Sequence, residues 1–260
     1  MTAPARPAST VCLLREGESG TEVLMVRRSE TARFMGGVWV FPGGVVDEED
    51  GGELARSVVL GPRGDEAPWL AACLRELVEE VGLWITTVGL RTTEPVHDVF
   101  ACAAADGLMF DGEALACFAH WITPAPLPIR FDTKFYAAHV AGGHEPSYDP
   151  EELSDVRWIT PAGALQLADR GEWSVAFPTR KALSMFESGT AAAFVAGARG
   201  TTVDAVQPRV VVEGGEVRFL LPDDVGFEEA ADDEADPEFL ARLVAASPGG
   251  DETNPELPRP

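Results

Sequence analysis

Cysteine, tyrosine and positive charge are all scarce in this sequence of 260 residues. Two tyrosines are present, and 20 Lys and Arg face 43 Asp and Glu, which gives a formal net charge of −23. The four cysteines lie far apart in apolar surroundings, at Cys12, Cys73, Cys102 and Cys117. This spacing predicts free, buried thiols in a reducing compartment rather than a disulfide framework or a cysteine-based metal site.

A long hydrophobic run is also missing. No stretch approaches the roughly 20 apolar residues of a membrane-spanning helix. Residues 1–9 have neither the basic start nor the apolar core of a secretion signal. We therefore expect a cytoplasmic globular protein without a membrane partner, built as one sizeable domain with an elaboration or as two small ones. The negative charge makes nucleic-acid polymers poor partners, and the oligomeric state stays open.

Much of that negative charge lies in residues 222–260, where twelve acidic residues face two arginines. Such a composition is typical of a solvated, partly disordered extension. Within it, residues 239–244 (Phe-Leu-Ala-Arg-Leu-Val) offer a short amphipathic helix that could dock. We expect a flexible N-terminus at 1–8, a main domain at 9–200, a β-hairpin extension at 201–226 and an acidic, partly disordered tail at 227–260.

The most informative segment is Arg75-Glu76-Leu77-Val78-Glu79-Glu80-Val81-Gly82-Leu83. On a helix, Leu70, Leu74, Leu77 and Val81 share one face, and the three glutamates gather on roughly the opposite one. One interpretation is a solvated face with an ordinary surface pair between Arg75 and Glu79. The other is a site for a hard cation such as Mg²⁺ or Mn²⁺, which prefers oxygen ligands.

A second segment favours the cation site. The apolar run Val38–Phe41 is followed by Pro42, Gly43 and Gly44. A Pro-Gly-Gly turn lets the backbone fold back tightly and frees a carbonyl to serve as a further oxygen ligand. Taken together, the two segments indicate a metal site for phosphate chemistry.

The pair of segments resembles the signature of the Nudix hydrolase superfamily. Gly44 matches its first glycine, and the stretch from Arg75 to Leu83 matches its second half completely. The first half departs from the signature, because Asp50 stands where Glu is expected and 24 residues rather than seven then precede Arg75. The excess segment, residues 51–66, is rich in glycine and charge, so we expect an exposed surface insertion.

The resemblance implies roles for these residues. Glu79, Glu80 and the Gly43 carbonyl would bind Mg²⁺ or Mn²⁺. Glu76 would complete the cluster, directly or through water, or orient the nucleophile, and Arg75 would aim a carboxylate by a charge-assisted hydrogen bond. The superfamily often supplies a further Glu from a late loop. We assign this catalytic role to Glu152, with the neighbouring Glu151 and Glu145 as alternatives.

An upstream stretch resembles the motif of the coenzyme A diphosphatase branch of that superfamily. It consists of residues 24–29 (Leu-Met-Val-Arg-Arg-Ser), then Arg33, Gly37 and residues 41–44. Val26 and Val45 depart from the motif. Arginine forks bind phosphate oxygens, so we expect three substrate-binding arginines: Arg28, Arg33 and Arg130. These arginines could instead be the polar end of a strand and its loop, and Arg130 could pair with Asp132 or a neighbouring loop.

Three functions follow from these resemblances. The first is hydrolysis of the diphosphate linkage of coenzyme A or acyl-coenzyme A to 3′,5′-ADP and 4′-phosphopantetheine or its acyl form. The second keeps the metal chemistry but acts on ADP-ribose, a dinucleotide or another nucleoside diphosphate derivative, and the departures at Val26 and Val45 favour it. The third is a non-catalytic binding module, against which the intact Arg-Glu-X-X-Glu-Glu set argues.

Strands and helices alternate along the sequence in a pattern typical of an α/β protein. The resemblance implies a Nudix-type α/β/α sandwich around a mixed β-sheet. We expect strands at 10–14, 22–28, 38–41, 45–46, 115–122, 134–140 and 156–159. Helices are expected at 68–81, from Pro161 onward and across 178–198, and a hairpin is expected at 209–221.

Overall fold

The computed structural model describes residues 3–32, 35–61, 64–186, 188–213 and 216–230. The tail beyond Ala230 and the motif residue Arg33 therefore lie outside the described residues. Among the described helices, none is long and apolar enough to cross a membrane.

A mixed sheet forms the centre of the molecule, with β1 (Arg6–Gly17) in its middle. On one side β1 pairs in parallel with β10 (Phe131–His139), and β9 (Ala116–Ile122) follows at the edge. On the other side β1 pairs antiparallel with β2 (Gly20–Arg28), and β11 (Leu153–Ile159) follows. Residues 6–8, expected to be flexible, are the first residues of β1 because they pair with the start of β10.

Two short strands lie between β1 and β2. The first two long strands pair directly only near their shared turn, from Leu14 to Val23. Farther from this turn β3 (Trp39–Val40) pairs with β2, and β4 (Gly43–Val45) pairs with β1. The Pro-Gly-Gly turn is therefore held between β1 and β2.

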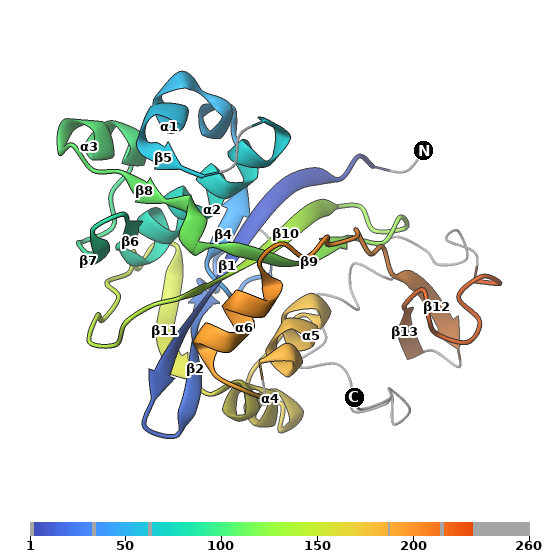
Figure 1. Ribbon diagram of the computed structural model, residues 1–260. Coiled ribbons are helices and arrows are strands. Elements are labelled where there is room, and N and C mark those ends of the chain that lie inside the picture. Colours follow the sequence, from blue (N-terminus) through green and yellow to red (C-terminus); the bar gives the residue numbers. More distant parts are fainter. Residues whose placement is uncertain (1–2, 33–34, 62–63, 187, 214–215, 231–260) are drawn as a thin grey trace.

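Helices cover both faces of this sheet (Figure 1). One face carries α1 (Glu53–Val58), α2 (Ala67–Val81) and α3 (Val99–Ala105), and the other carries α4 (Pro161–Asp169), α5 (Phe177–Met185) and α6 (Ala191–Ala198). Alternation along β1 supplies both cores, because Val11 and Leu13 pack toward α2 while Cys12 and Leu14 pack on the opposite side. This is the expected α/β/α sandwich.

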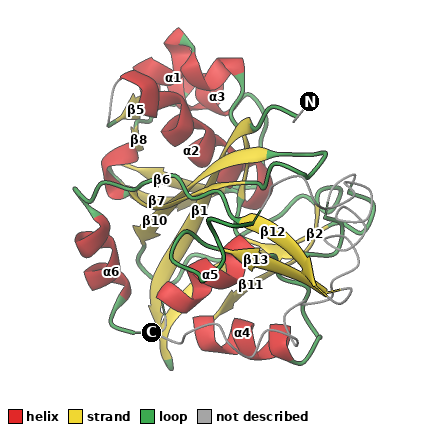
Figure 2. Ribbon diagram, turned by 90° about the vertical axis from the view of Figure 1, so that its right-hand side faces the viewer, coloured by secondary structure: helices red, strands yellow, loops and turns green. Residues whose placement is uncertain are grey.

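Smaller elements flank the sandwich. A second sheet contains β5 (Val59–Leu60), β8 (Phe110–Asp111), β6 (Leu83–Thr86) and β7 (Gly89–Thr92). Single 3-10 turns lie at Glu48–Gly51, Gly64–Glu66 and Gly112–Ala114. The hairpin of β12 (Arg209–Glu213) and β13 (Glu216–Leu220) is separate from both sheets (Figure 1) and lies in front of the central sheet in the view of Figure 2.

Two expectations differ from the structure. The insertion at 51–66 is not a plain surface loop: Ala55, Val58 and Val59 are buried in the core on the α2 side. The glycines and charges at its ends conceal a short apolar pattern that forms α1 and β5. The helix expected across 178–198 is two helices, because α5 ends at Met185 and Thr190 caps a new helix with its side chain.

Candidate active site

The helix α2 carries most of the candidate site. Pro68 stands in its first turn, and Gly82 ends it in a left-handed conformation with φ of 64°. Its apolar face is buried as expected, but Arg75 and Glu80 are also only 4% exposed. Charged residues are rarely buried to this degree unless they are paired. The interpretation of this helix face as a solvated surface therefore does not describe these two residues.

Asp50 and Arg75 form a buried ion pair. Arg75 Nε donates to Asp50 Oδ1 at 2.9 Å, and Arg75 Nη2 donates to Asp50 Oδ2 at 3.0 Å. The Asp50 side chain is fully buried, and its Oδ2 also accepts the backbone N–H of Asp47 at 2.8 Å. The acid six positions after Gly44 therefore reaches Arg75 despite the inserted segment. Sequence reasoning did not predict this contact, and the position of Asp50 six residues after Gly44 is the signal that could have indicated it.

The remaining N–H groups of Arg75 donate hydrogen bonds to two glutamates and a backbone carbonyl. Nη1 donates to Glu79 Oε2 at 2.7 Å and to Glu76 Oε1 at 3.0 Å, and Nη2 donates to the Val45 carbonyl at 3.0 Å. All five N–H groups of the guanidinium are thus used. Burial opposes the charge of Arg75, but its hydrogen bonds to Asp50 and the negative charge of the nearby carboxylates hold its pKa above the ordinary value. Arg75 is therefore a charged residue that positions two glutamates.

The glycine turn lies directly against these glutamates. The Gly43 N–H donates to Glu80 Oε2 at 3.0 Å. Gly43 has φ of +152°, and a Cβ there would come within 2.3 Å of the Ser9 carbonyl oxygen. A Cβ on Gly44 would lie 2.3 Å from Glu76 Oε1. A turn without side chains thus lets Gly43 lie against β1 and Gly44 against the Glu76 carboxylate.

Hydrogen bonds from β1 fix this turn. Thr10 Oγ1 donates to the Pro42 carbonyl at 2.7 Å, and the Val11 N–H donates to the same oxygen at 2.9 Å. Sequence reasoning gave Thr10 no role, because a threonine within a strand carries no distinctive signal. The contact expected of Gly43 was through its carbonyl oxygen, whereas the contact formed with Glu80 is through its N–H.

Two of these glutamates hold their protons unusually strongly. Burial raises the pKa of Glu76 to about 7, against the opposing charge of Arg75. Burial also raises the pKa of Glu80 well above its ordinary value, and the Glu76 carboxylate raises it further. The Gly43 N–H and the Arg28 guanidinium act in the opposite direction on Glu80. When these two glutamates are ionised, their negative charges therefore lie close together without enough positive charge to balance them.

Glu152 and Arg28 join the cluster from the other side. The Glu152 carboxylate lies close enough to raise the pKa of both Glu76 and Glu80. Its backbone carbonyl accepts the Ser29 N–H at 2.8 Å, which ties the start of β11 to the end of β2. Of the alternatives to Glu152, Glu145 pairs with Arg15 at 3.5 Å. Among the three late glutamates, the structure places Glu152 beside the helix acids.

The other arginines have different places. The side chain of Arg130 donates to the Thr123 carbonyl at 3.0 Å, the Ala3 carbonyl at 2.7 Å and Gln207 Oε1 at 2.9 Å. Arg130 thus belongs to the scaffold rather than to the expected substrate contacts, because its donors bind a neighbouring loop and two other segments. Arg33 lies outside the described residues.

The donor set suits a hard divalent cation such as Mg²⁺ or Mn²⁺. The groups gathered here are carboxylates from Glu76, Glu79, Glu80 and Glu152, and the burial of Glu80 leaves charge that a cation would neutralise. In the described ranges, no three acidic, histidine or cysteine side chains already converge on one point. Glu79 is directed to Arg75 and Glu80 to Gly43, so these carboxylates must turn to hold a cation together.

Comparison with known proteins identifies the family of the chain. Residues 4–178 match the model of the NUDIX domain family. The chain belongs to this family. It is 34% identical over 168 residues to a Caenorhabditis elegans protein named "Putative nudix hydrolase 7"; the match covers 60% of this chain and 52% of that protein. This NUDIX chain thus spans about half the length of the curated relative it matches.

A solved structure supports the fold as well as the family. The NUDIX hydrolase from Alicyclobacillus acidocaldarius is 29% identical and superposes with a TM-score of 0.62. The match covers 75% of this chain and 93% of the bacterial one. The residues beyond the family match include α6 and the β12–β13 hairpin.

Proposed function

We propose that this NUDIX protein is a metal-dependent hydrolase that cleaves the diphosphate linkage of coenzyme A or acyl-coenzyme A. The products would be 3′,5′-ADP and 4′-phosphopantetheine or its acyl form. The observation that carries the proposal is the buried network in which Arg75 binds Glu76 and Glu79, the Gly43 N–H binds Glu80, and burial raises the pKa values of Glu76 and Glu80. Such a network serves to gather negative charge that a cation neutralises.

The residues would divide the work as follows. Glu76, Glu79 and Glu80 hold Mg²⁺ or Mn²⁺, with Gly43 beside them, and Arg75 keeps two of the carboxylates in position. When bound there, such a cation would supply positive charge for the diphosphate oxygens and for lowering the pKa of a water molecule. Glu152, which is exposed and adjacent to the helix acids, accepts a proton from the attacking water.

The substrate assignment depends mainly on Arg28. Its guanidinium lies near Glu80 at the edge of the cluster, where it can meet a phosphate bound to the same cation. The neighbouring Arg27 is committed elsewhere, because it donates to Glu30 at 2.5 Å and to the Gly37 carbonyl at 3.2 Å. Two adjacent arginines of the motif therefore have separate tasks. Arg27 shapes the loop after β2, and Arg28 meets the substrate.

Product analysis tests the reaction. The purified protein is incubated with Mg²⁺ or Mn²⁺ and with coenzyme A, acyl-coenzyme A, ADP-ribose or NADH, and the products are separated by chromatography. The proposal expects 3′,5′-ADP from the two coenzyme A substrates at the highest kcat/KM. Preference for ADP-ribose or NADH would assign the same metal chemistry to a different nucleoside diphosphate derivative. Binding without turnover of any substrate would indicate a non-catalytic module.

A pair of variants tests the substrate contact. Arg28→Ala is expected to lower kcat/KM for coenzyme A by one to two decades, since a charge-assisted contact to phosphate is worth roughly 1.5–3 kcal/mol. If Arg28 meets the 3′-phosphate, dephospho-coenzyme A is much less affected. Arg27→Ala is the matched control and should leave the ratio between the two substrates unchanged. Equal losses on both substrates in Arg28→Ala would restrict Arg28 to the diphosphate or to structure.

A further inference from the structure

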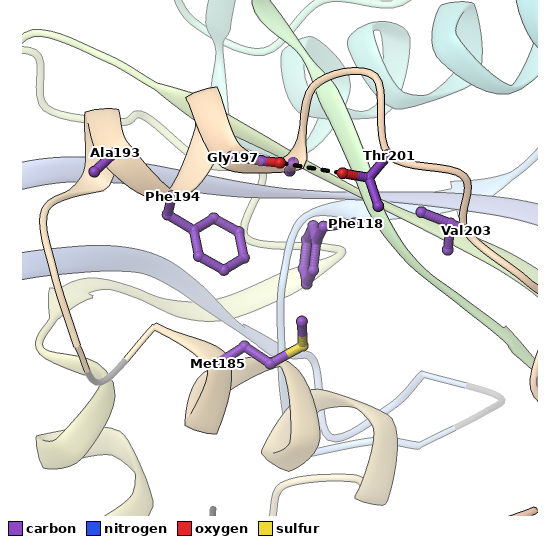
Figure 3. Close-up of a pocket in the computed structure, with 8 residues that line it drawn as sticks. Phe118, Met185, Ala193, Phe194, Gly197, Thr201 and Val203 are labelled. Carbon is purple, nitrogen blue, oxygen red and sulfur yellow. Dashed lines mark hydrogen bonds between the residues drawn. The ribbon is translucent and has the colours of Figure 1, made fainter.

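An apolar hollow lies on the face of the sheet opposite to α2. Its volume is about 330 Å³. Figure 3 shows the ring of Phe118, from β9, facing Phe194, from α6, with Met185 at the end of α5 beneath them. The remaining lining side chains are small or apolar: Ala193, Gly197, Ala198, Thr201 and Val203. None of the described residues that line the hollow is charged, so it suits an apolar occupant.

The helix beside the hollow has no polar face. All eight residues of α6 are Ala, Gly, Val or Phe, yet Ala192, Ala193, Ala196 and Gly197 are exposed. A helix that is apolar all round is normally covered on all sides. Met185, across the hollow, is likewise a large apolar side chain with 45% of its surface exposed. Both observations indicate that something covers this side of α6.

We propose that residues 239–244 of the same chain dock in this hollow as an amphipathic helix. In the last 30 residues of the sequence, the large apolar side chains are concentrated in Phe239, Leu240, Leu243 and Val244. At 100° per residue these four fall on one face. Asp236 and Pro237 precede them in the order typical of a helix start, and Ser247-Pro248 follows. A helix of this kind binds a groove through side chains spaced by one turn.

The connection is long enough. The described chain ends at Ala230, whose carbonyl accepts Arg209 Nη1 at 3.1 Å beside the β12–β13 hairpin. That hairpin contacts the first turn of α5 through Phe219, which stacks on Phe177 at 5.1 Å. The hollow lies at the other end of α5, about 13 Å away along nine helical residues. The nine residues from Ala230 to Phe239 span up to about 30 Å.

Hydrogen exchange on the full-length protein tests the docking. The double variant Leu240→Asp/Leu243→Asp places two charges on the docking face. The control Ala241→Asp/Ala245→Asp adds the same charges to the other face, at a cost in helix propensity that is at least as large. Met185→Glu alters the hollow at an exposed position. A melting curve and the exchange of α2 amides check that each variant remains folded.

The proposal expects residues 239–246 of the unaltered protein to exchange at least ten-fold more slowly than an unstructured peptide. This protection should disappear in Leu240→Asp/Leu243→Asp and in Met185→Glu, together with part of the protection of α6, and be largely retained in the control. Exchange at the unstructured rate in the unaltered protein would overturn the proposal. So would protection insensitive to Met185→Glu, or protection lost on dilution as a dimer dissociates, which would assign the hollow to a second copy of the chain.

Discussion

The two faces of the central sheet are formed by the same strands, but they bury different kinds of side chain. Toward α2, the core reaches a group of charged side chains, and Arg75 and Glu80 are buried nearly as deeply as Leu70 on the same helix. Toward α5 and α6, the core is formed by rings, with Phe41, Phe118, Phe135, Phe186 and Phe194 in contact with one another, and it opens into an apolar hollow.

The difference shows what each kind of burial requires. On the α2 face every donor of Arg75 has a partner, because an unpaired buried charge would cost several kcal/mol. On the other face apolar contacts need no such matching, and residues of similar volume can replace one another. On the α2 face, stability should thus depend on single hydrogen-bonding atoms. On the α5–α6 face, it should depend on side-chain volume and on whether a charge is introduced.

The largest contrast is expected in turnover. Glu79→Gln and Glu80→Gln should each reduce turnover by orders of magnitude while the protein stays folded, because a neutral amide binds a hard cation poorly. Met185→Ala, on the opposite face, should leave turnover nearly unchanged. Steady-state rates at limiting Mg²⁺ measure both. Near-normal rates in the two glutamine variants would remove these residues from the metal site.

The next effect concerns stability. Arg75→Met should lower the free energy of unfolding by about 3–5 kcal/mol, since it leaves the Asp50 carboxylate buried without its partner. Urea denaturation monitored by circular dichroism gives the value. The double variant Asp50→Asn/Arg75→Met should recover part of the loss. If the single variant unfolds with the same midpoint as the unaltered protein, the ion pair is not as buried as described.

A smaller effect is expected in the inserted segment. Val58→Ala should cost roughly 1–3 kcal/mol, because Val58 is buried in the core on the α2 side. Leu54→Ala, four positions earlier on the same helix and 44% exposed, is the matched control, and a change within about 0.5 kcal/mol is expected there. Equal small losses in both variants would show that the segment is a loop without packing.

A further predicted effect is a pH dependence without metal. The pKa of Glu76 is raised to about 7 from an ordinary value of 4.5, so the folded state binds this proton more tightly than the unfolded state. The resulting stabilisation is complete below pH 4.5 and is lost as the pH rises through 7. In the presence of a chelator, the melting temperature should therefore fall as the pH rises from 5 to 8. The fall should be steeper for the unaltered protein than for Glu76→Gln. Parallel curves would contradict the shift.

More of the α2 face than of the α5–α6 face could be predicted from the sequence. The pattern of Arg75, Glu76, Glu79 and Glu80 is specific, because few helices place these charges at this spacing after a Pro-Gly-Gly turn. The role of Asp50 was harder to predict, since 24 residues separate it from Arg75 in the sequence and only folding brings them together. For Arg130 the sequence left both a phosphate contact and a neighbouring loop open, because an arginine that binds backbone carbonyls has no distinctive sequence signal.

The hollow was not predictable at all. Alanine and glycine in α6 are compatible with almost any environment, and the aromatic residues that meet there come from distant segments. The inserted segment was wrongly expected to be an exposed loop for a related reason. The glycines and charges at its ends are more conspicuous in the sequence than the three apolar residues that are buried within it. Charge at fixed spacing is thus readable from a sequence, whereas the closeness of packed surfaces depends on the tertiary fold.

Calorimetric titration with Mn²⁺ tests the central claim most directly. Because Glu76 and Glu80 hold protons more strongly than ordinary carboxylates, cation binding near neutral pH should release protons. Titrations at pH 6.5 in two buffers of different ionisation enthalpy measure that release. The account predicts saturable binding with proton release in the unaltered protein and greatly weakened binding in Glu80→Gln. Equal binding in both proteins, or binding without proton release, would contradict it.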